Sequence, residues 1–565
     1  MTEATAAGMS YVDAVAATTA PGRAYETRRE TIEGVGYTVF ANAPRSLREV
    51  FGRARSYEDR TFLVYEDERW SFGDVMARVD ALAAVLTGHF GVRKGDRVAV
   101  AMRNYPEWIV SFAAATSVGA ISVSMNAWWT EEELDYALGD CGATVLIADE
   151  ERCERAAAPA DRRGIRILGV RLPASAPGPI DRWEDLVRPG PPMPDVDVGP
   201  DDDATILYTS GTTGHPKGAV STHRAVLQAL MGFGCRAAVD SMRTGTPPVT
   251  DPAGLPVFIL VVPLFHVTGC VPVMLSCFAS GLKLVIMHRW DPERALELIE
   301  RERVTNFVGV PTQSWDLLEC PRFAEFDTSS LKSVGGGGAP APPELVRRVA
   351  TNFAKARPGI GYGMTETNAY GPQNGGEDYL ARPTSAGRAT PILEIDVRDA
   401  DGAPVAAGKQ GEIWFKGPNL IRGYWDNPEA TAETLVNGWL RSGDLGFMDD
   451  DGFVYVVDRA KDMILRAGEN VYCAEVEAVL YEHPAVYEAA VFGVPHERLG
   501  EDVAAAVVPK AGQAVTAEAL REHVGKHLAP FKVPSQILLM PEPLPRNAAG
   551  KFLKTELRAR VVGGA

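Results

Sequence analysis

The residues from Tyr208 to Gly218 have the clearest chemical character in the sequence, and they read Tyr-Thr-Ser-Gly-Thr-Thr-Gly-His-Pro-Lys-Gly. The glycines let a backbone approach a ligand closely, the hydroxyl side chains can donate hydrogen bonds, and Lys217 adds a positive charge. This is the chemistry needed to hold a triphosphate. The segment is not a P-loop, because that pattern has glycine before its lysine and Ser or Thr after it, whereas Pro216 and Gly218 flank Lys217.

The surrounding sequence predicts an α/β framework to position this loop, because strand-like apolar runs alternate with helical patterns. Ile206 and Leu207 precede the loop, so a strand is expected to lead into it. Asp291 is a natural N-cap and Pro292 suits the first helical position, so a helix is expected to run from there to about residue 303. Buried strands are expected at 97–102, 144–148, 282–287 and 306–310.

A chain of 565 residues is too long for one hydrophobic core, so two or more units are expected. The pattern restarts at about Lys461, which predicts a small separate α+β domain. Residues 1–45 show weak structure signals and are interpreted as an N-terminal extension. The elements expected in the last domain are a helix at 474–481, strands at 486–491 and 503–508, and a helix at 516–527.

Composition excludes several classes of protein. The formal net charge is −17, so nucleic acid would be repelled and is excluded as a main partner. The seven cysteines show no CxxC spacing, which indicates reduced thiols. The N-terminus lacks a secretory pattern, and the longest aliphatic or aromatic run, 257–262, is far shorter than the about 20 residues of a membrane span. We expect a cytoplasmic protein without a transmembrane segment, with peripheral membrane contact and a homodimer left open.

The loop at 208–218 closely resembles the phosphate-binding loop of the adenylate-forming superfamily, which includes acyl-CoA synthetases, peptide-synthetase adenylation domains and firefly luciferase. The resemblance continues in order through 335–340, 361–367, 438–446 and 545–551, and it covers roughly residues 60–555. It implies a large multi-subdomain α/β adenylation domain at 46–460 and a small mobile α+β domain at 461–565. It also implies an AMP-forming acid–thiol ligase that uses ATP, Mg²⁺ and coenzyme A to make acyl-CoA through an acyl-adenylate.

The resemblance assigns a nucleotide site. Tyr362 is expected to stack on adenine, Thr365 to bind the α-phosphate and Glu366 to hold Mg²⁺. A carboxylate beside a triphosphate would indeed be repelled unless a hard divalent cation bridged the two groups. Asp444 is expected to accept hydrogen bonds from the ribose hydroxyls, and Arg459 to contact the ribose or a phosphate. The complete expected set of nucleotide-binding residues is Thr209, Ser210, Gly211, Thr212, Thr213, Gly214, Lys217, Gly338, Ala339, Pro340, Tyr362, Asp444 and Arg459.

One position departs from the family pattern. Many relatives have an amide or acid two residues before the stacking aromatic side chain, where it accepts from the adenine amino group. This chain has Ile360 there. Base recognition is therefore expected to rest on backbone carbonyls.

The resemblance also assigns the moving parts. Lys461 matches the hinge about which the small domain rotates between two half-reactions. Gly468 and Glu469 lie in the loop expected to face coenzyme A. Lys551 matches the lysine that bridges carboxylate and phosphate oxygens during adenylation, where its charge offsets the negative charges brought together. The expected catalytic set is Lys551, Thr365, Glu366 and His266.

The acyl pocket is expected to be lined by His266, Gly309, Gly335, Gly336 and Gly363. In acetate-specific relatives a tryptophan occupies the position of Gly363, so this chain is expected to take a larger acid. The region of His266 carries no aspartate for a substrate amine, which disfavours an amino acid. A medium- or long-chain fatty acid is the first expectation, followed by an aryl or alicyclic acid. Residues 240–254 are interpreted as a segment that shapes the entrance.

Other functions remain alternatives. The acceptor could be an acyl carrier protein acting in trans instead of coenzyme A, although no fused carrier domain follows Lys551. A luciferase-like oxygenase has no sequence feature in its favour. A non-catalytic nucleotide-binding protein is disfavoured, because Lys551, Glu366 and Thr365 are all present. Thiol acceptors test the first alternative, and pyrophosphate release tests the last.

Overall fold

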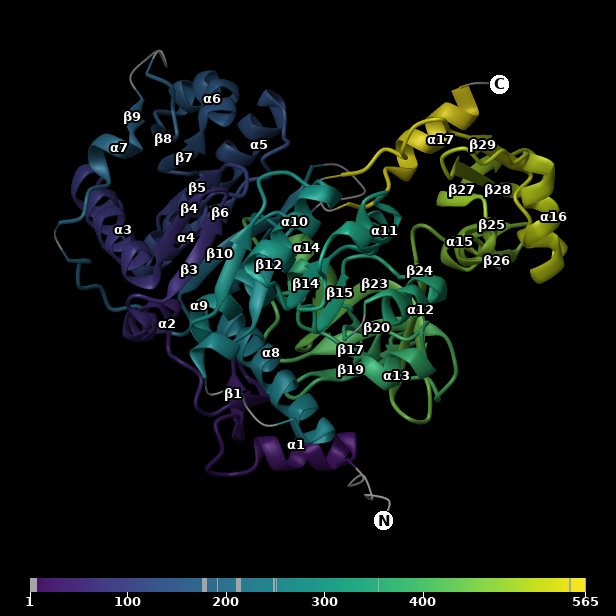
Figure 1. Cartoon of the computed structure of the whole chain (residues 1–565), viewed down its shortest axis with the longest axis horizontal. Coiled ribbons are helices and arrows are strands. Elements are labelled where there is room, and N and C mark those ends of the chain that lie inside the picture. Colours follow the sequence, from purple (N-terminus) through teal and green to yellow (C-terminus); the bar gives the residue numbers. More distant parts are fainter. Residues whose placement is uncertain are drawn as a thin grey trace.

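Three β-sheets and one β-hairpin organise the computed structural model of the protein, which describes residues 8–174, 180–190, 192–209, 215–246, 249, 251–353, 355–547 and 550–563. Two of the sheets form a large domain, and the third lies in a small C-terminal domain beside it (Figure 1). This arrangement confirms the predicted α/β fold with a small α+β domain at the C-terminus.

The first sheet has eight strands among the described residues, and its central strands run parallel. Their spatial order is β21 (Gly423–Tyr424), β11 (Lys217–Thr222), β10 (Asp203–Thr209), β6 (Ile121–Ser124), β5 (Arg97–Ala101), β7 (Val145–Asp149), β8 (Arg166–Val170) and β9 (Asp181–Arg182). The strands predicted at 97–102 and 144–148 are therefore confirmed as β5 and β7.

The second sheet has fourteen strands in the part of the chain that the structure describes. Its parallel half is β16 (Arg357–Gly361), β15 (Ser333–Gly337), β14 (Asn306–Gly309), β12 (Val257–Leu260), β13 (Lys283–Ile286) and β3 (Thr61–Tyr65), with β4 (Glu68–Ser71) antiparallel at the edge. The other half is antiparallel, with β17 (Gln373–Gly375), β18 (Gly387–Arg388), β24 (Phe453–Arg459), β23 (Trp439–Met448), β20 (Gly411–Lys416), β19 (Glu394–Arg398) and β22 (Leu435–Val436).

Both faces of the first sheet are buried, which explains the continuous apolar strands. Along β5, Val98 and Val100 pack into the main core, whereas Ala99 and Ala101 pack into a second core on the opposite face. The main core also contains α3 (Phe72–Ala84) and α4 (Pro106–Ser117), and the second contains α5 (Glu131–Cys141) and α6 (Glu150–Arg163). Every residue of α4 is buried, because this helix shares one core with strands of both sheets.

The unit from β13 to β14 forms as the sequence predicts. Asp291 caps α10 (Pro292–Glu302) by accepting a hydrogen bond from the backbone N–H of Arg294 at 2.8 Å, and Pro292 opens the helix. Helices α11 (Pro311–Glu319), α12 (Pro343–Asn352) and α13 (Gly376–Ala381) lie beside the second sheet, whereas α8 (His223–Thr244) packs against β10 and β11 of the first sheet and against α9 (Ser276–Ser280). Helix α14 (Pro428–Thr434) follows β21.

The N-terminal extension is more ordered than its weak sequence signals predict. Within its described residues it forms α1 (Tyr11–Thr19) and a hairpin of β1 (Thr27–Ile32) and β2 (Val35–Phe40). The Tyr11 hydroxyl donates to the carbonyl of Ala389 at 2.9 Å, and Gln228 of α8 pairs with the Phe40 backbone. These partners lie hundreds of residues away along the chain, so local patterns could not reveal the packing.

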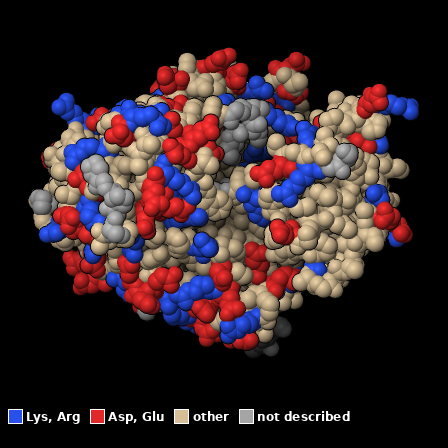
Figure 2. Space-filling model, turned by 90° about the horizontal axis from the view of Figure 1, so that it is seen from above, with Lys and Arg blue, Asp and Glu red and all other residues tan. Residues whose placement is uncertain are grey.

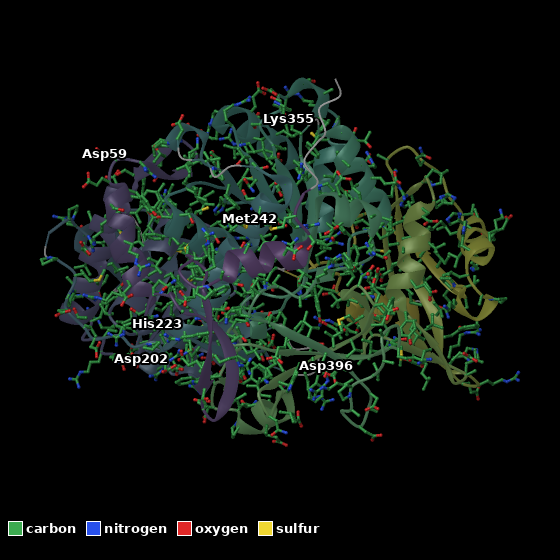
Figure 3. The ribbon with its side chains drawn as sticks, turned by 90° about the horizontal axis from the view of Figure 1, so that it is seen from below. Asp59, Asp202, His223, Met242, Lys355 and Asp396 are labelled. Carbon is green, nitrogen blue, oxygen red and sulfur yellow. The ribbon has the colours of Figure 1, made fainter. Side chains whose placement is uncertain are left out.

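Residues 240–244, part of the segment interpreted as shaping the substrate entrance, form the last turn of α8. Met242 there accepts a hydrogen bond from Thr18 of α1, and Figure 3 shows α1 beside it. Residues 247, 248 and 250 of that segment lie outside the described residues. None of the helices that the structure describes has the length and apolar character to span a bilayer.

The C-terminal domain has its own sheet and two apolar cores, one on each face. Its strands are β26 (Glu469–Val471), β25 (Ile464–Arg466), β28 (Gly500–Pro509), β27 (Val486–His496) and β29 (Gln536–Leu539). Its helices are α15 (Cys473–Glu482), α16 (Ala517–His527) and α17 (Lys554–Gly563). All four elements predicted in this domain are present.

Close packing of β14 against β15 predicts that Gly336→Ala destabilises the protein. A Cβ at Gly336 would lie 1.6 Å from the carbonyl oxygen of Gly309, so the strands must separate. We expect a loss of about 3 kcal/mol or more, seen as a lower midpoint of thermal unfolding.

Gly52→Ala is the matched control. Gly52 lies in α2 (Leu47–Ala54), and a Cβ added there would have no atom within 4 Å, so alanine should be neutral or stabilise by up to about 1 kcal/mol. Equal midpoints for the two variants would contradict the packing argument.

Candidate active site

Charged side chains from both domains gather at the junction between the domains. Glu366, Asp444 and Arg459 come from the large domain and Lys551 from the C-terminal domain. Burial and the nearby Arg459 lower the pKa of Lys551 to about 8, while Asp444 and Glu366 act in the opposite direction. Figure 2, which views the molecule from above relative to Figure 1, shows a hollow near the middle of the surface, with Lys and Arg side chains at its edge. The structure thus brings together four residues that the sequence separates by up to 185 positions, from Glu366 to Lys551.

Glu366 is held in a rigid turn. It lies in the short 3₁₀ segment Thr365–Thr367 and is only 6% exposed. Asn368 follows in the left-handed region with φ 53°, and its side chain donates to the carbonyl of Asn419 at 3.0 Å. Burial raises the pKa of the Glu366 carboxyl, and a hydrogen bond from the Tyr424 hydroxyl, 2.8 Å from Oε1, opposes this rise.

Tyr424 and Asn368 are site residues that the sequence reasoning missed. Tyr424 reaches Glu366 because β21 pairs with β11, the strand that follows the phosphate loop. A two-residue strand has no periodic signal, so its pairing is invisible in the sequence. Asn368 lies directly after Thr365–Thr367, and the known tolerance of asparagine for positive φ could have marked it.

Tyr362 and Asp444 form one hydrogen-bonded unit. The Tyr362 hydroxyl donates to Asp444 Oδ2 at 2.5 Å, and Arg459 Nε lies 3.4 Å from Asp444 Oδ1. Asp444 and Arg459 face each other because β23 and β24 pair at these residues. Burial raises the pKa of Asp444, and Arg459 opposes the rise. The unit therefore presents a buried carboxylate whose two oxygens have different donors.

The predicted phosphate loop connects β10 to β11 as an antiparallel hairpin, with Thr209 opposite Lys217. Its tip, which contains Ser210, Gly211, Thr212, Thr213 and Gly214, lies outside the described residues. The Lys217 ammonium lies 5.2 Å from the centre of the Tyr424 ring. Lys217 and Glu366 therefore contact the same tyrosine, which places the described base of the loop beside the charged cluster.

The glycines expected to line the acyl pocket have a structural reason to be glycine. A Cβ at Gly335 would lie 2.3 Å from the Gly359 oxygen, and one at Gly363 would lie 2.6 Å from the Ala369 oxygen. A tryptophan could not replace Gly363 without movement of the backbone. Gly363 therefore reports on backbone packing and does not by itself indicate the size of the substrate.

A small cavity borders Gly335, Gly336 and Ile360 beneath α12. Its volume of about 30 Å³ holds one or two water molecules, far below the about 300 Å³ of a ligand pocket. Gly309, Gly363 and His266 do not line it. His266 instead lies near Lys551, and burial together with that lysine lowers the pKa of His266 to about 4.

Gly338, Ala339 and Pro340 follow β15 directly, and Gly338 has φ +83°, a conformation that glycine tolerates. They continue the strand that packs beside β16, which leads to Tyr362. The three residues therefore lie at the edge of the sheet from which Tyr362 extends.

The predicted hinge lies between the two domains. Lys461 is exposed in the connection from β24 to β25. Just before it, the Asp458 carboxylate accepts the backbone N–H of Cys473 at 2.5 Å and so caps α15. Gly468 and Glu469 are exposed on the β25–β26 turn, and no contact among the described residues joins them to Glu366 or Lys551.

Two further contacts hold the C-terminal domain against the large domain. The Tyr487 hydroxyl donates to Asp316 Oδ1 at 2.5 Å, while Trp290 donates to Asp316 Oδ2 at 2.8 Å. Arg546, five residues before Lys551, lies 3.4 Å from the Thr312 hydroxyl. Asp316 and Thr312 are both on α11, so this helix fixes the orientation of the Lys551 segment.

Comparisons with known proteins agree with this geometry. The sequence model of the AMP-binding enzyme family matches residues 50–425, and the model of the AMP-binding enzyme C-terminal domain matches residues 475–551. The chain is 36% identical over 499 residues to the long-chain-fatty-acid–CoA ligase FadD13 of Mycobacterium tuberculosis, covering 87% of this chain and 93% of that protein. It is 37% identical over 510 residues to a feruloyl-CoA synthase from Streptomyces, covering 90% and 97%.

A solved structure shows the same architecture. The o-succinylbenzoate CoA synthetase MenE from Bacillus subtilis, in complex with the acyl-adenylate OSB-AMP, superposes with a TM-score of 0.76 and 29% identity. The match covers 91% of this chain and 98% of that one.

The Tyr362–Asp444 hydrogen bond predicts that Tyr362→Phe destabilises the protein. The variant leaves a buried carboxylate without one of its donors, at a cost of about 1.5–3 kcal/mol. Urea unfolding followed by tryptophan fluorescence measures the difference.

Tyr379→Phe is the matched control, because the Tyr379 hydroxyl is buried and has no hydrogen-bond partner among the described residues. Its removal should leave stability unchanged or raise it. If Tyr379→Phe were the more destabilising change, the Tyr362 hydroxyl would not have the stabilising role described.

Proposed function

The chain belongs to the AMP-binding enzyme family, within the adenylate-forming superfamily, and from this premise we propose that it joins a carboxylic acid to coenzyme A through an acyl-adenylate. It is an AMP-forming acyl-CoA synthetase, for which ATP and coenzyme A are substrates. The observation that carries the proposed mechanism is the position of Lys551, which the C-terminal domain places beside Glu366, Asp444 and Arg459.

In the first half-reaction, a carboxylate oxygen of the acid attacks the α-phosphorus of ATP. The new O–P bond forms as the bond to pyrophosphate breaks. Negative charge accumulates around the α-phosphate, and Lys551 and Arg459 are positioned to offset it in a site that is partly shielded from water. No side-chain nucleophile is needed, because both reactants are held together by the protein.

The nucleotide is proposed to lie along the edge formed by the ends of β10, β15 and β16. Tyr362 offers its ring to the adenine, and Asp444 accepts from the ribose hydroxyls. Thr365, Lys217 and the loop 209–214 bind the phosphates, next to Gly338, Ala339 and Pro340. With Ile360 in place of a polar side chain, the adenine amino group must find its acceptor on the backbone.

The residues present suit Mg²⁺. Glu366 is a buried carboxylate, and one of its oxygens accepts from the Tyr424 hydroxyl. A hard oxygen ligand of this kind, together with phosphate oxygens and water, is the set that Mg²⁺ prefers. When bound, the ion neutralises phosphate charge. Glu366 would hold it, and Tyr424 would keep that carboxylate oriented.

In the second half-reaction, the C-terminal domain rotates about Lys461 and withdraws Lys551. The loop with Gly468 and Glu469 then faces the acyl-adenylate. The coenzyme A sulfur, having lost its proton, attacks the acyl carbon, the C–S bond forms, and the C–O bond to AMP breaks. The exposed position of Gly468 and Glu469 here supports this division of labour, since the loop is free to move with its domain.

A medium- or long-chain fatty acid is the proposed substrate, with an aryl or alicyclic acid as the alternative. The segment after His266 is apolar and buried, including Val267, Cys270 and Val271, which suits an apolar acyl group. The relatives act on both classes, because one is named for long-chain fatty acids and the other for feruloyl-CoA.

Pyrophosphate release over a panel of acids tests this function. The panel runs from acetate to palmitate and includes benzoates, cinnamates and a sterol side-chain acid, each with and without coenzyme A. We expect turnover that depends on one class of acid and on coenzyme A. Pyrophosphate release that coenzyme A does not accelerate would point to a carrier-protein acceptor. If none of the acids in the panel supported pyrophosphate release, the proposed substrate classes would be contradicted.

The low pKa of Lys551 predicts an alkaline limit for adenylation. Its pKa of about 8 in the free protein means that the ammonium loses its proton as the pH rises through this value, so kcat/KM for ATP should fall above pH 8. Because only the adenylation half-reaction uses this charge, thioester formation from supplied acyl-adenylate should keep its rate over the same range.

Lys551→Arg provides the internal test, because a guanidinium stays protonated throughout. The residual adenylation activity of this variant should no longer fall as the pH rises above about 8. Lys526→Arg, on the exposed face of α16, is the control and should keep the wild-type profile. An unchanged alkaline limit in Lys551→Arg would assign the titration to another group.

A further inference from the structure

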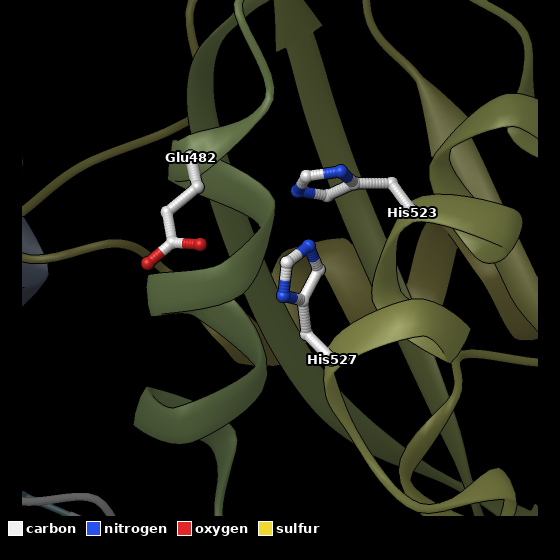
Figure 4. A group of neighbouring side chains, drawn as sticks. All are labelled: Glu482, His523 and His527. Carbon is white, nitrogen blue, oxygen red and sulfur yellow. The ribbon is translucent and has the colours of Figure 1, made fainter.

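A second cluster of metal-binding side chains lies in the C-terminal domain, away from Lys551. Glu482 is the last residue of α15, and His523 and His527 lie on α16. One ligand atom from each side chain lies within 4.8 Å of the others. Figure 4 shows the carboxylate and both imidazole rings in the space between the two helices.

The helix spacing explains why the two histidines meet. Residues four apart lie on one face of a helix, and the ring centres of His523 and His527 are 4.9 Å apart. Leu520 and Val524 of the same helix pack into the domain core, which fixes the helix against α15. The cluster is thus held by buried packing although its own side chains remain accessible.

The hydrogen-bond and ion-pair partners of His523 and Glu482 are consistent with binding of a metal ion. His523 Nε2 lies 3.0 Å from the carbonyl oxygen of Val479, a hydrogen bond that fixes the ring against α15 in the way that outer partners orient metal-binding histidines. The Glu482 carboxylate has no ion-pair or hydrogen-bond partner among the described residues. The neighbouring lysine, Lys526, is already paired with Glu522 at 2.9 Å, so it does not neutralise Glu482.

His483 lies beside the cluster but is not a candidate ligand. Its ring centre is 5.2 Å from that of His523. Its Nδ1 accepts the backbone N–H of Ala485 at 3.2 Å, so the lone pair of the neutral ring is already used.

We propose that Glu482, His523 and His527 bind one zinc ion or a zinc-like divalent ion that links α15 to α16. Two imidazoles and one carboxylate are a ligand set that Zn²⁺ accepts, with water in the fourth position, whereas Mg²⁺ prefers oxygen ligands alone. Metal bonds of about 2.0–2.1 Å require the ligand atoms to approach to roughly 3.3 Å. The exposed Glu482 and His527 side chains can make this small adjustment.

The ion would stiffen the domain that moves. Helix α15 starts at Cys473, whose backbone N–H is bonded to Asp458 at the hinge. A link from the far end of α15 to α16 would make the C-terminal domain rotate as one rigid body. The ion takes no part in the reaction, so the site is independent of the proposed function.

Zinc titration of the full chain, prepared without a histidine tag and treated with a chelator, tests the proposal. Isothermal titration without ATP should give a binding step in the wild type that His523→Ala/His527→Ala loses or weakens at least about tenfold, the loss that even outer-shell changes cause. Glu482→Gln should weaken the same step. Zn²⁺ should also raise the midpoint of thermal unfolding of the wild type alone.

Glu518→Gln is the matched control, since it removes a carboxylate from the same helix, where Glu518 pairs with Arg521 at 3.1 Å, and leaves the pair of Lys526 with Glu522 intact. It should bind Zn²⁺ as the wild type does. Three results would overturn the proposal. These are no Zn²⁺ binding by the wild type at 100-fold molar excess, binding unchanged by the double variant and by Glu482→Gln, or an equal His-dependent response to Mg²⁺.

Discussion

The burial of two carboxylates beside two cations, one of them from another domain, is the constraint on which the rest of the structure depends. Burial raises the pKa of both Glu366 and Asp444, so neither charge is stable there without a partner. Arg459 and Lys551 supply positive charge, but burial and mutual repulsion still lower the pKa of Lys551. Lys551 is therefore incompletely neutralised in the free protein. In the proposed mechanism, a phosphate group relieves this imbalance.

The backbone has to be unusually close-packed to hold these charges in place. Gly335 and Gly336 let β14, β15 and β16 approach so closely that a single methyl group would collide with a backbone carbonyl of a neighbouring strand. Of these strands, β16 leads directly to Tyr362 and to the turn with Glu366. The glycine-rich composition of this region is thus a consequence of strand packing as much as of ligand access. It fixes where the charges lie.

Local patterns predicted the elements that depend on neighbouring residues. The strand–helix–strand unit around Asp291 forms as expected because its cap, its proline and its apolar period all act within a few residues. The α/β class was predicted from the alternation of strand-like apolar runs with helical patterns along the chain. The site itself was predicted through a family resemblance, because nothing in the local sequence says that Lys551 meets Glu366. Contacts between distant segments were missed for the same reason, as Tyr424 on Glu366 and α1 on α8 show.

The contacts that place Lys551 in the site are weak enough to be reversible. Tyr487 bonds Asp316 and Arg546 approaches Thr312, both across the domain junction. Hydrogen bonds contribute about 0.5–1.5 kcal/mol each, or about 1.5–3 kcal/mol when one partner is charged, so these two are worth a few kcal/mol together. By contrast, the Asp458–Cys473 bond lies at the hinge, where rotation changes distances least. In the proposed mechanism, Lys551 faces less negative charge once pyrophosphate has left, and it loses part of what held it. The proposed domain rotation would then draw on the same electrostatic imbalance, since the C-terminal domain is held less strongly after the first half-reaction than before it.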